Sequence, residues 1–580
     1  MEAKDGQTDV TDHQEHGLEH DQGHPTDSGH MGTTKHVVEE ERTDNIKQHD
    51  KRDQVEVPAR NFTGKQQQPL KELETALGLL GKADDTSRFV GLALLKPVLE
   101  HALSQENNKG EELETLILRS WKAIPSKFLD GLLKAKPNEK TPKEDVQNMV
   151  ALAVAVLNAF MRLLGSHQTD TKFIGRVPLL VPILRSCDPE TRTQIMDILH
   201  SVIMTPEGSL AVFRTDSTAA NDDQKPSSYL FVTMLLVDIR ATIPSLQEKL
   251  HSKDYSAISA RLARAYDIVS AFVVYLVQSL EKMLDDESSK RTSTAPIPVD
   301  LLLRLRTNIS ESMSLTIEYL RDRYDSSTAG AAGLHPDARS ADGVGSSNPL
   351  PIAWETSSGM FTDPLTLAQL SCLSLWLRDE ENDALRKEAT GVMDVLLALY
   401  QHGEDRKAFE EHEKQGQDGH RIFRSTVLVA LEGIIETPEG VEVFLHEEGW
   451  NLLSEDLVAI ATAPKDHLQG IEIVRVLLAV LESGFAGATK EEWMALVDLA
   501  DKALASTAED GDLEFGIAVS QIAVELLVRA PRGIRNKNRE VAQALLKRAE
   551  ALSMKDHVDE GIEDGLEEVV EGLESLDLGQ

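Results

Sequence analysis

Seven histidines near the start of the chain are the side chains whose type and number most suggest chemistry. They are His13, His16, His20, His24, His30, His36 and His49. Imidazole groups among carboxylates can bind a borderline metal such as zinc or nickel. However, their spacing is irregular and no cysteine lies among them, whereas a structural zinc site needs ligands held in tetrahedral geometry. We therefore predict no metal site, and we interpret residues 1–64 as a disordered leader with too few apolar residues to fold.

The stretch ALGLLGK, residues 76–82, comes nearest to a nucleotide-binding loop. A P-loop needs glycine where this chain has Ala76, and a hydroxyl residue where it has Ala83. The sequence also contains no G-x-S-x-G nucleophile elbow, no H-E-x-x-H zinc motif and no Rossmann fingerprint following a strand. We therefore predict no catalytic residue, no cofactor-binding residue and no cofactor. An undetected enzyme stays open as a second alternative, since histidines and carboxylates far apart in sequence can meet in a fold.

Tryptophans could bind a basic peptide, as they do in armadillo karyopherins, where an asparagine follows each tryptophan by one helical turn. Here the residues four positions later are not asparagine: Trp121 is followed by Pro125, Trp376 by Glu380, Trp450 by Ser454 and Trp493 by Val497. We therefore predict that these four side chains anchor a core. Trp354 lies in a predicted loop, where its indole could dock into a partner or be buried by the loop. The sequence does not identify the partner-binding residues.

Composition favours an all-α protein that binds other proteins. The chain has 580 residues, a formal charge of -37 and 4% aromatic residues. A core with few rings and many aliphatic side chains favours helices packed on helices. The negative charge repels phosphate backbones and anionic lipid headgroups. We therefore predict protein partners, basic surfaces among them, and no nucleic acid.

The sequence predicts a cytoplasmic location without membrane insertion. Its most apolar run, AFVVYLV at 271–277, is far shorter than the roughly 20 residues that span a bilayer. The first residues contain no apolar core for a signal peptide. The only cysteines are Cys187 and Cys372, too few for a framework of disulfides, which fits a reducing compartment. The sequence leaves the oligomeric state open.

The tetrapeptide TPEG occurs at 205–208 and again at 437–440. The apolar residues before each copy recur at i, i+3, i+4, i+7 and i+8, the spacing of one buried helix face. They are Ile195, Ile198, Leu199, Val202 and Ile203 in the first copy and Val427, Ala430, Leu431, Ile434 and Ile435 in the second. We predict that each threonine caps the following helix, with proline at its first position and glutamate at the positive end of its dipole. That helix should bury Val212 and Phe213 in the first copy, and Val443 and Phe444 in the second.

A second pattern, D-x-x-R-x-x-small, occurs at two predicted helix starts. The two copies are Asp85, Arg88 and Gly91, and Asp383, Arg386 and Ala389, while DPETR at 188–192 is a looser version. The aspartate should cap the helix, the arginine should reach back to it or across to a neighbouring repeat, and the small residue should let helices approach. This usage is typical of HEAT and armadillo repeats, whose period is about 40 to 47 residues. No constant register fits the chain, and an ordinary pair of helical domains is the alternative.

Apolar patterning divides the rest of the chain into four ranges. Residues 65–324 and 362–555 have helical spacing and form two predicted helical-repeat blocks, separated by a Gly-, Ser- and Pro-rich flexible insertion at 325–361. Residues 556–580 contain no basic residue and form an acidic amphipathic tail or a capping helix. The apolar face of that tail consists of Val558, Ile562, Leu566, Val569, Leu573 and Leu576. The glycines Gly561, Gly565 and Gly572 should weaken the helix by roughly 1 kcal/mol each. We predict an irregular HEAT- or armadillo-like α-solenoid with a disordered leader and a long internal loop.

The stretch DDTSRFVGLALLKPVLE, residues 84–100, resembles the N-terminal helix region of the neurochondrin family. The layout of the chain over roughly residues 66–555 is also similar, with a DPETR-type helix start and TPEG-like turns. The resemblance implies a cytoplasmic armadillo-like protein without enzymatic activity that acts in signalling through partners. In animals the family is tied to neurite growth and to restraint of kinase signalling. The His-rich leader and the loop at 325–361 depart from the animal proteins.

Sequence and resemblance together predict a non-enzymatic scaffold for protein–protein interaction or a signalling regulator. A chaperone-like or transport cargo adaptor is the first alternative. An adaptor should bind several clients weakly, whereas a dedicated regulator should have one stoichiometric partner.

Overall fold

The computed structural model describes fifteen stretches of the chain, all of which lie within the compact unit Thr63–Gln580. They are residues 67–104, 111–137, 142–164, 171–184, 186–214, 225–249, 252–285, 297–329, 363–379, 383–402, 417–462, 466–487, 489–505, 510–554 and 560–576. The predicted leader and most of the predicted insertion therefore lie outside the described residues. The helix that precedes the insertion ends at Ala329, inside the range predicted as a loop.

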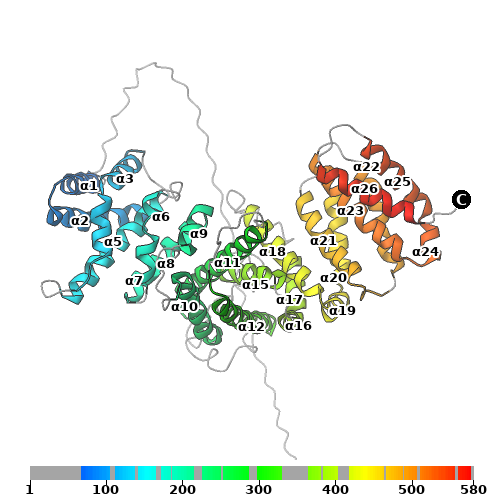
Figure 1. Cartoon of the computed structure of the whole chain (residues 1–580), viewed down its shortest axis with the longest axis horizontal. Coiled ribbons are helices and arrows are strands. Elements are labelled where there is room, and N and C mark those ends of the chain that lie inside the picture. The colour runs from blue at the N-terminus through cyan, green and yellow to red at the C-terminus, as the bar shows by residue number, and fades with distance from the viewer. Residues whose placement is uncertain are drawn as a thin grey trace, which may run out of the picture. The chain divides into compact units, whose positions relative to one another are not determined.

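The regular elements of the described residues are all helices (Figure 1). In the first half they are α1 (Gln67–Leu80), α2 (Asp85–Ser104), α3 (Glu111–Ala123), α4 (Ser126–Leu133), α5 (Lys143–Leu164), α6 (Thr171–Ile174), α7 (Val177–Ile183), α8 (Pro189–Ile203), α9 (Pro206–Phe213), α10 (Ser227–Thr242), η3 (Ile243–Ser245), η4 (Gln247–Lys249), α11 (Tyr255–Asp285) and α12 (Val299–Ala329). In the second half they are α15 (Pro364–Asp379), α16 (Asp383–Ala389), η6 (Thr390–Val392), α17 (Met393–His402), α18 (Gln417–Ile435), α19 (Pro438–His446), α20 (Gly449–Thr462), α21 (His467–Glu482), η8 (Glu491–Met494), α22 (Ala495–Ala505), α23 (Asp510–Arg529), α24 (Arg532–Lys537), α25 (Arg539–Ser553) and α26 (Glu560–Ser575).

These helices form two rows in which each member packs against the next. One row consists of α2, α5, α8, α11, α15, α18, α21, α23 and α26. The other consists of α4, α7, α10, α12, α16, α19, α20, α22 and α25. The rows also contact each other, for example through α10 and α11, α22 and α23, and α25 and α26. Two rows of helices in which each pair contacts mainly its sequence neighbours define an α-solenoid, so the predicted fold class is confirmed.

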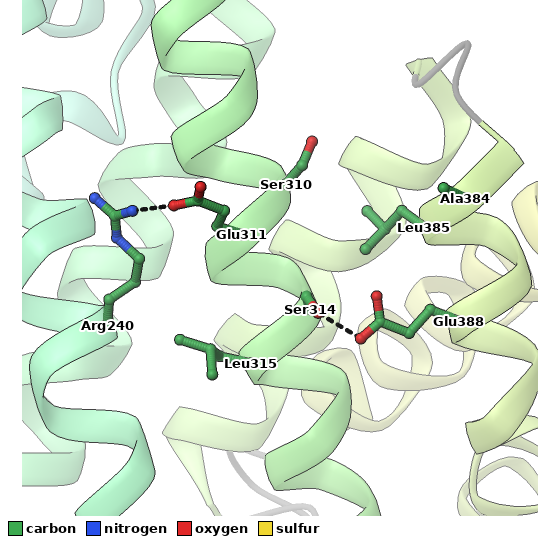
Figure 2. Close-up of a pocket in the computed structure, with 8 residues that line it drawn as sticks. All are labelled: Arg240, Ser310, Glu311, Ser314, Leu315, Ala384, Leu385 and Glu388. Carbon is green, nitrogen blue, oxygen red and sulfur yellow. Dashed lines mark hydrogen bonds and ion pairs between the residues drawn. The ribbon is translucent and has the colours of Figure 1, made fainter. Parts of the chain in front are cut away.

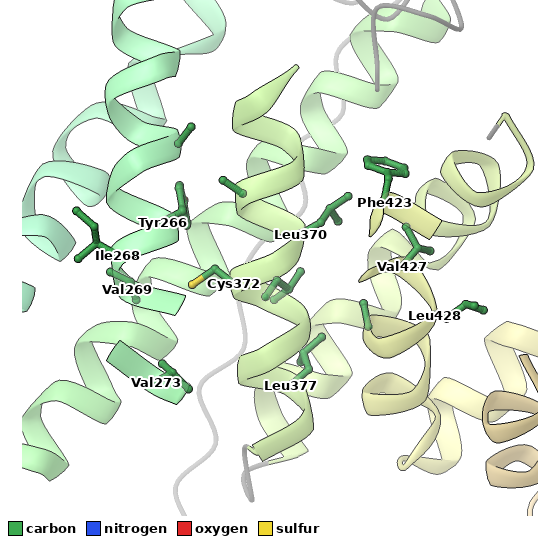
Figure 3. Close-up of a cluster of buried hydrophobic side chains, with 14 of the residues drawn as sticks. Tyr266, Ile268, Val269, Val273, Leu370, Cys372, Leu377, Phe423, Val427 and Leu428 are labelled. Carbon is green, nitrogen blue, oxygen red and sulfur yellow. The ribbon is translucent and has the colours of Figure 1, made fainter. Parts of the chain in front are cut away.

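The core continues from α11 through α15 to α18, as Figure 3 shows. Tyr266 and Val269 on α11 face Cys372 on α15, and Leu370 of α15 faces Phe423 on α18. All five side chains are buried. The helices on either side of residues 330–362 therefore share one hydrophobic core.

No constant register fits the chain, because the length of the repeat changes along it. This length can be measured as the number of residues between two side chains that pair across neighbouring repeats. Near the C-terminus the polar pairs are 46 or 47 residues apart, as in Arg548 with Asp501 and Lys537 with Glu491. In the middle of the chain the separation is larger, with 71 residues for Arg240 with Glu311 and 74 for Ser314 with Glu388. Helices of unequal length contribute to this irregularity, since α11 and α12 have 31 residues each whereas α22 has 11 and α23 has 20.

Both TPEG turns have the predicted structure. Thr205 Oγ1 accepts a hydrogen bond from the backbone N–H of Gly208 at 3.1 Å, and Thr437 Oγ1 does the same for Gly440 at 3.1 Å. Each proline is the first residue of the next helix. The ten stripe residues predicted before the turns are all buried. After the second turn the prediction was wrong in one position, because Val441 is fully buried and Val443 is only half-buried.

The glycine of each TPEG turn allows a close contact that sequence analysis did not identify. A Cβ atom on Gly208 would lie 1.9 Å from the carbonyl oxygen of Val202, and one on Gly440 would lie 2.0 Å from that of Ile434. Because no side chain fits at that distance, the turn requires glycine as well as the capping threonine.

The two copies of D-x-x-R-x-x-small use their arginines differently. Arg88 Nη1 reaches back to Asp85 Oδ1 at 2.9 Å, although the residue that caps α2 is Asp84, whose Oδ1 accepts from the N–H of Ser87 at 2.7 Å. The prediction that Asp85 is the cap was therefore wrong. Gly91 confirms the close approach, because a Cβ there would lie 3.0 Å from Leu79 Cβ on α1. In the looser version, Asp188 caps α8 by accepting from the N–H of Thr191 at 2.9 Å.

The second copy joins the two recurring motifs. Arg386 donates to the carbonyl oxygen of Leu377 at 3.1 Å and pairs with Glu436 at 2.6 Å, directly before the second TPEG turn. The next residue, Lys387, pairs with Glu439 inside that turn at 3.0 Å. A hydrogen bond from its own backbone N–H, assisted by the Lys387 ammonium, lowers the pKa of Glu439. Here the arginine reaches across to the neighbouring repeat.

Helix α26 packs against both α23 and α25. Of its predicted apolar face, Ile562, Leu566, Val569, Leu573 and Leu576 are buried, while Val558 lies outside the described residues. Two of its glycines let the helices approach closely, because a Cβ on Gly565 would lie 2.9 Å from Ile517 Cγ2 and one on Gly572 would lie 2.4 Å from Val524 Cγ1.

Among the described helices, α5 alone is long and apolar enough to cross a membrane, which the sequence analysis did not anticipate. Length and composition are weak evidence for a span, because the core helix of a solenoid has the same properties. Just over half of its apolar window, 56%, is buried, and α5 packs between α2 and α8.

Candidate protein-binding surface

Buried ionisable side chains could mark a reactive site, and the first such group lies between α11, α12 and the start of α15. Arg323 pairs with Asp363 at 2.8 Å, and their side chains are 1% and 6% exposed. Arg323 Nη1 also donates to the hydroxyl oxygen of Tyr319 at 2.9 Å and to that of Tyr255. Burial raises the pKa of both tyrosines. A paired charge with protonated phenols holds three helices together and leaves no free base or nucleophile.

The second buried group joins α17, α18 and α20. Arg424 pairs with Asp456, and the Tyr400 hydroxyl donates to the same carboxylate. The Arg424 guanidinium lies 4.1 Å from the centroid of the Tyr400 ring, a cation–π distance. Burial raises the pKa of Tyr400. As in the first group, the charges are used to connect neighbouring repeats.

Burial makes both cysteines poor nucleophiles, although to different degrees. Cys372 on α15 is buried, and burial raises the pKa of its thiol to about 12. Cys187, just before α8, is half-buried, and desolvation raises its pKa as well. Because the thiolate is the reactive form, neither side chain is activated for covalent chemistry.

The leader histidines, which we predicted not to bind metal, lie outside the described residues. In the fifteen described stretches, no group of three or more His, Cys, Asp or Glu side chains is arranged to hold a metal ion. Gly81 and Lys82 of the rejected nucleotide-binding stretch lie in the turn between α1 and α2.

Three of the four tryptophans predicted as core anchors are buried. Trp121 stacks on Phe173 with a centroid distance of 4.5 Å, and Trp450 stacks on Trp493 at 4.1 Å. Trp376 is half-buried, and its indole N–H donates to Ser310 Oγ at 3.3 Å. The predicted exposed indole, Trp354, lies outside the described residues.

A cleft of about 460 Å³ opens between α10, α12 and α16, and Figure 2 shows its lining. It is lined by Arg240, Ser310, Glu311, Ser314, Leu315, Ala384, Leu385 and Glu388. Arg240 on α10 pairs with Glu311 on α12, and Ser314 of α12 donates to Glu388 on α16. The cleft thus lies across three successive helices of one row and combines two leucines with two carboxylates.

This cleft could not be predicted from the sequence, because its residues come from three helices that are far apart in the chain. The only local signal is the spacing of Ser310 and Ser314, which places two small polar side chains on one helix face. That spacing is common on helix surfaces, so it does not distinguish a binding site.

Comparison with known proteins gives one family and several structures. A family model described as Neurochondrin matches residues 65–220 and 215–478. The comparison with curated proteins gives no match. A crystal structure of an engineered protein is 15% identical, with a TM-score of 0.44 and coverage of 87% of this chain and 99% of that one. A structure from work on a phosphorylation switch between cadherin and β-catenin is 12% identical, with a TM-score of 0.34 and coverage of 87% and 91%. A crystal structure of importin β is 10% identical, with a TM-score of 0.23 and coverage of 87% and 69%.

Proposed function

The chain belongs to the neurochondrin family, as its sequence predicted, and on that premise we propose that it is a non-enzymatic scaffold or signalling regulator that binds protein partners in the cytoplasm. The proposal is supported by one observation: the buried charged side chains pair with one another instead of forming a reactive site. The Arg323–Asp363 and Arg424–Asp456 pairs connect repeats, so the polar chemistry of the interior serves the stack itself. The exposed surface of successive helices is then the part of the molecule available for recognition.

The cleft between α10, α12 and α16 is our proposed first contact for a partner. Glu311 is already paired with Arg240, so Glu388 and the leucines Leu315 and Leu385 are the side chains that favour a basic side chain with an apolar stem. The overall charge of -37 would steer a basic partner towards the protein and repel an acidic one.

The proposal is tested by affinity capture from native extract with the full-length chain, washed first at low and then at high salt. A specific partner should remain at high salt in a fixed stoichiometry, because apolar contacts are not screened by ions. Loss of every bound protein at high salt would leave only nonspecific charge attraction and would contradict the proposal. Several weakly bound clients would favour a cargo adaptor, and turnover of a bound molecule would favour an enzyme.

The cleft is tested separately with two matched variants. Ala384→Arg places a long side chain in the cleft, whereas Ala93→Arg makes the same change of size and charge at an exposed position of α2. We expect the retained partner to be lost with Ala384→Arg and kept with Ala93→Arg. Equal capture by both variants would exclude the cleft as the contact while leaving the scaffold function standing.

A further inference from the structure

The two helices before the last one, α24 and α25, carry a concentrated positive charge in an otherwise acidic protein. Residues 529–548 contain one acidic and seven basic residues, a net charge of +6, so the other 560 residues sum to -43. The basic residues are Arg529, Arg532, Arg535, Lys537, Arg539, Lys547 and Arg548. They lie at the end of α23 and on α24 and α25 (Figure 1). Seven cations in twenty residues are not explained by the acidic character of the chain.

One of these arginines, Arg535, joins α24 to the end of α23. Arg535 Nε donates to the carbonyl oxygen of Leu527 at 3.0 Å, and its Nη2 donates to that of Val528 at 2.9 Å. These carbonyls lie in the last turn of α23, where the helix has no N–H groups left to satisfy them. Arg535 therefore holds α24 against α23 and is not counted among the cations available to a ligand.

Three of the remaining cations are paired with carboxylates. Arg529 pairs with Glu525 within α23. Lys537 Nζ lies 2.6 Å from Glu491 Oε1, but the two side chains are 64% and 67% exposed, so water competes strongly for this pair. Arg548 Nε lies 2.7 Å from Asp501 Oδ1 on α22.

Arg532, Arg539 and Lys547 make no ion pair with any residue that the structure describes. Arg539 and Lys547 lie eight positions apart, which places them roughly 80° from each other around the axis of α25. Although α25 packs against the acidic α26, no ion pair between their described side chains neutralises this charge. The unpaired cations are therefore available to an external ligand.

We propose that Arg532, Lys537, Arg539 and Lys547, which we call the basic face, bind a short acidic segment of a partner protein. The inference rests on the proposed scaffold function and adds a second surface of opposite sign to the cleft. Helix α25 has 15 residues and is about 22 Å long, the length of roughly seven residues in an extended peptide. Arg539 and Lys547 lie on this helix, and Arg532 and Lys537 lie on α24, which packs against it.

The small size of the basic face favours a peptide over nucleic acid or a membrane. Charges separated by more than about 8 Å are largely screened at physiological ionic strength. A short segment therefore responds to the basic face alone. A bilayer or a duplex is a broad anionic surface, and it would also meet the adjacent acidic face of α26, which contains Glu563, Glu567 and Glu574.

The experiment measures binding of fluorescein-labelled octaglutamate to the full-length protein by anisotropy, with a neutral Gly-Ser peptide as the ligand control. We expect octaglutamate to bind the wild type, with affinity falling as salt rises from about 50 to about 300 mM. The variant Arg532→Gln/Arg539→Gln/Lys547→Gln should bind roughly tenfold more weakly or worse. The matched variant Lys127→Gln/Lys134→Gln/Lys253→Gln removes three exposed cations elsewhere and should bind like the wild type.

Several results would overturn the inference. Absence of octaglutamate binding, or equal loss in both triple variants, would show that the basic face is not the site. Tighter binding to vesicles with anionic lipid or to single-stranded RNA, lost in the first variant only, would assign the face to a different ligand. A lower melting temperature in the first variant only would make its cations structural. Capture of a salt-resistant partner can succeed while octaglutamate fails, so the scaffold function and the basic face are tested independently.

Discussion

At the scale of single residues, the glycine that ends each TPEG turn is as specific as the threonine that begins it. The capping threonine supplies a hydrogen bond, whereas the glycine leaves room for a carbonyl oxygen of the preceding helix. The turn can therefore be recognised by both ends of the tetrapeptide.

The variant Gly440→Ala tests the close contact. Its Cβ would lie 2.0 Å from the carbonyl oxygen of Ile434, so the helices must separate and stability should fall by roughly 2 kcal/mol or more. Urea unfolding followed by circular dichroism measures the change. Gly131→Ala on α4 is the control, because a Cβ there meets nothing within 4 Å and alanine has the higher helix propensity. Equal effects of the two substitutions would contradict the contact.

Cysteine reactivity is a second test at this scale. Because burial raises the pKa of Cys372 to about 12, its thiol should stay protonated and unlabelled in the native protein at pH 8. We expect the variant Cys187→Ser, which retains only Cys372, to react with a thiol reagent in urea and not in buffer. Rapid labelling of the folded variant would show that α15 opens far more often than its buried core allows.

At the scale of elements, α26 shows why glycine is not always a weak point of a helix. From helix propensity alone, Gly561, Gly565 and Gly572 are expected to be equally destabilising. The structure separates them, because only Gly565 and Gly572 face α23 closely, while a Cβ on Gly561 would meet nothing within 4 Å.

The substitutions Gly572→Ala and Gly561→Ala should therefore have opposite effects on thermal stability. A Cβ at position 572 would lie 2.4 Å from Val524 Cγ1, so this variant should melt at a lower temperature than the wild type. At position 561 alanine should stabilise the helix by up to about 1 kcal/mol. Differential scanning calorimetry of both variants gives the comparison, and stabilisation by Gly572→Ala would mean that α26 is not packed on α23.

At the scale of the whole molecule, stability should be distributed along the stack, since each helix contacts mainly its neighbours. Truncation after Met554 removes α26 and exposes the apolar surface of α23 and α25. We expect hydrogen exchange to accelerate in α23 and α25 and to remain unchanged in α2 and α5. Unchanged exchange in α23 would show that the last helix is not a cap, and uniform acceleration would show a single cooperative unit.

The sequence predicts the parts of this molecule that depend on local patterns. Helix faces such as Ile195 to Ile203 and caps such as Thr437 follow from spacing and residue type, which is why the solenoid could be predicted. The buried pair of Arg323 and Asp363 could not, because its members belong to different helices and neither carries a local signal. The cleft could not be predicted either, because it depends on the spacing of α10, α12 and α16 in the fold.

Because α11, α15 and α18 share one core, we expect that residues 330–362 are not needed as a covalent link. Helix α15 is held by side chains of α11 and α12 and by the ion pair of Arg323 with Asp363. Two separately produced fragments, 1–329 and 363–580, should therefore reassemble when they are expressed together, and they should copurify through a tag on either one. The chain would then serve as a split reporter, in which reconstitution signals that two fused proteins have met.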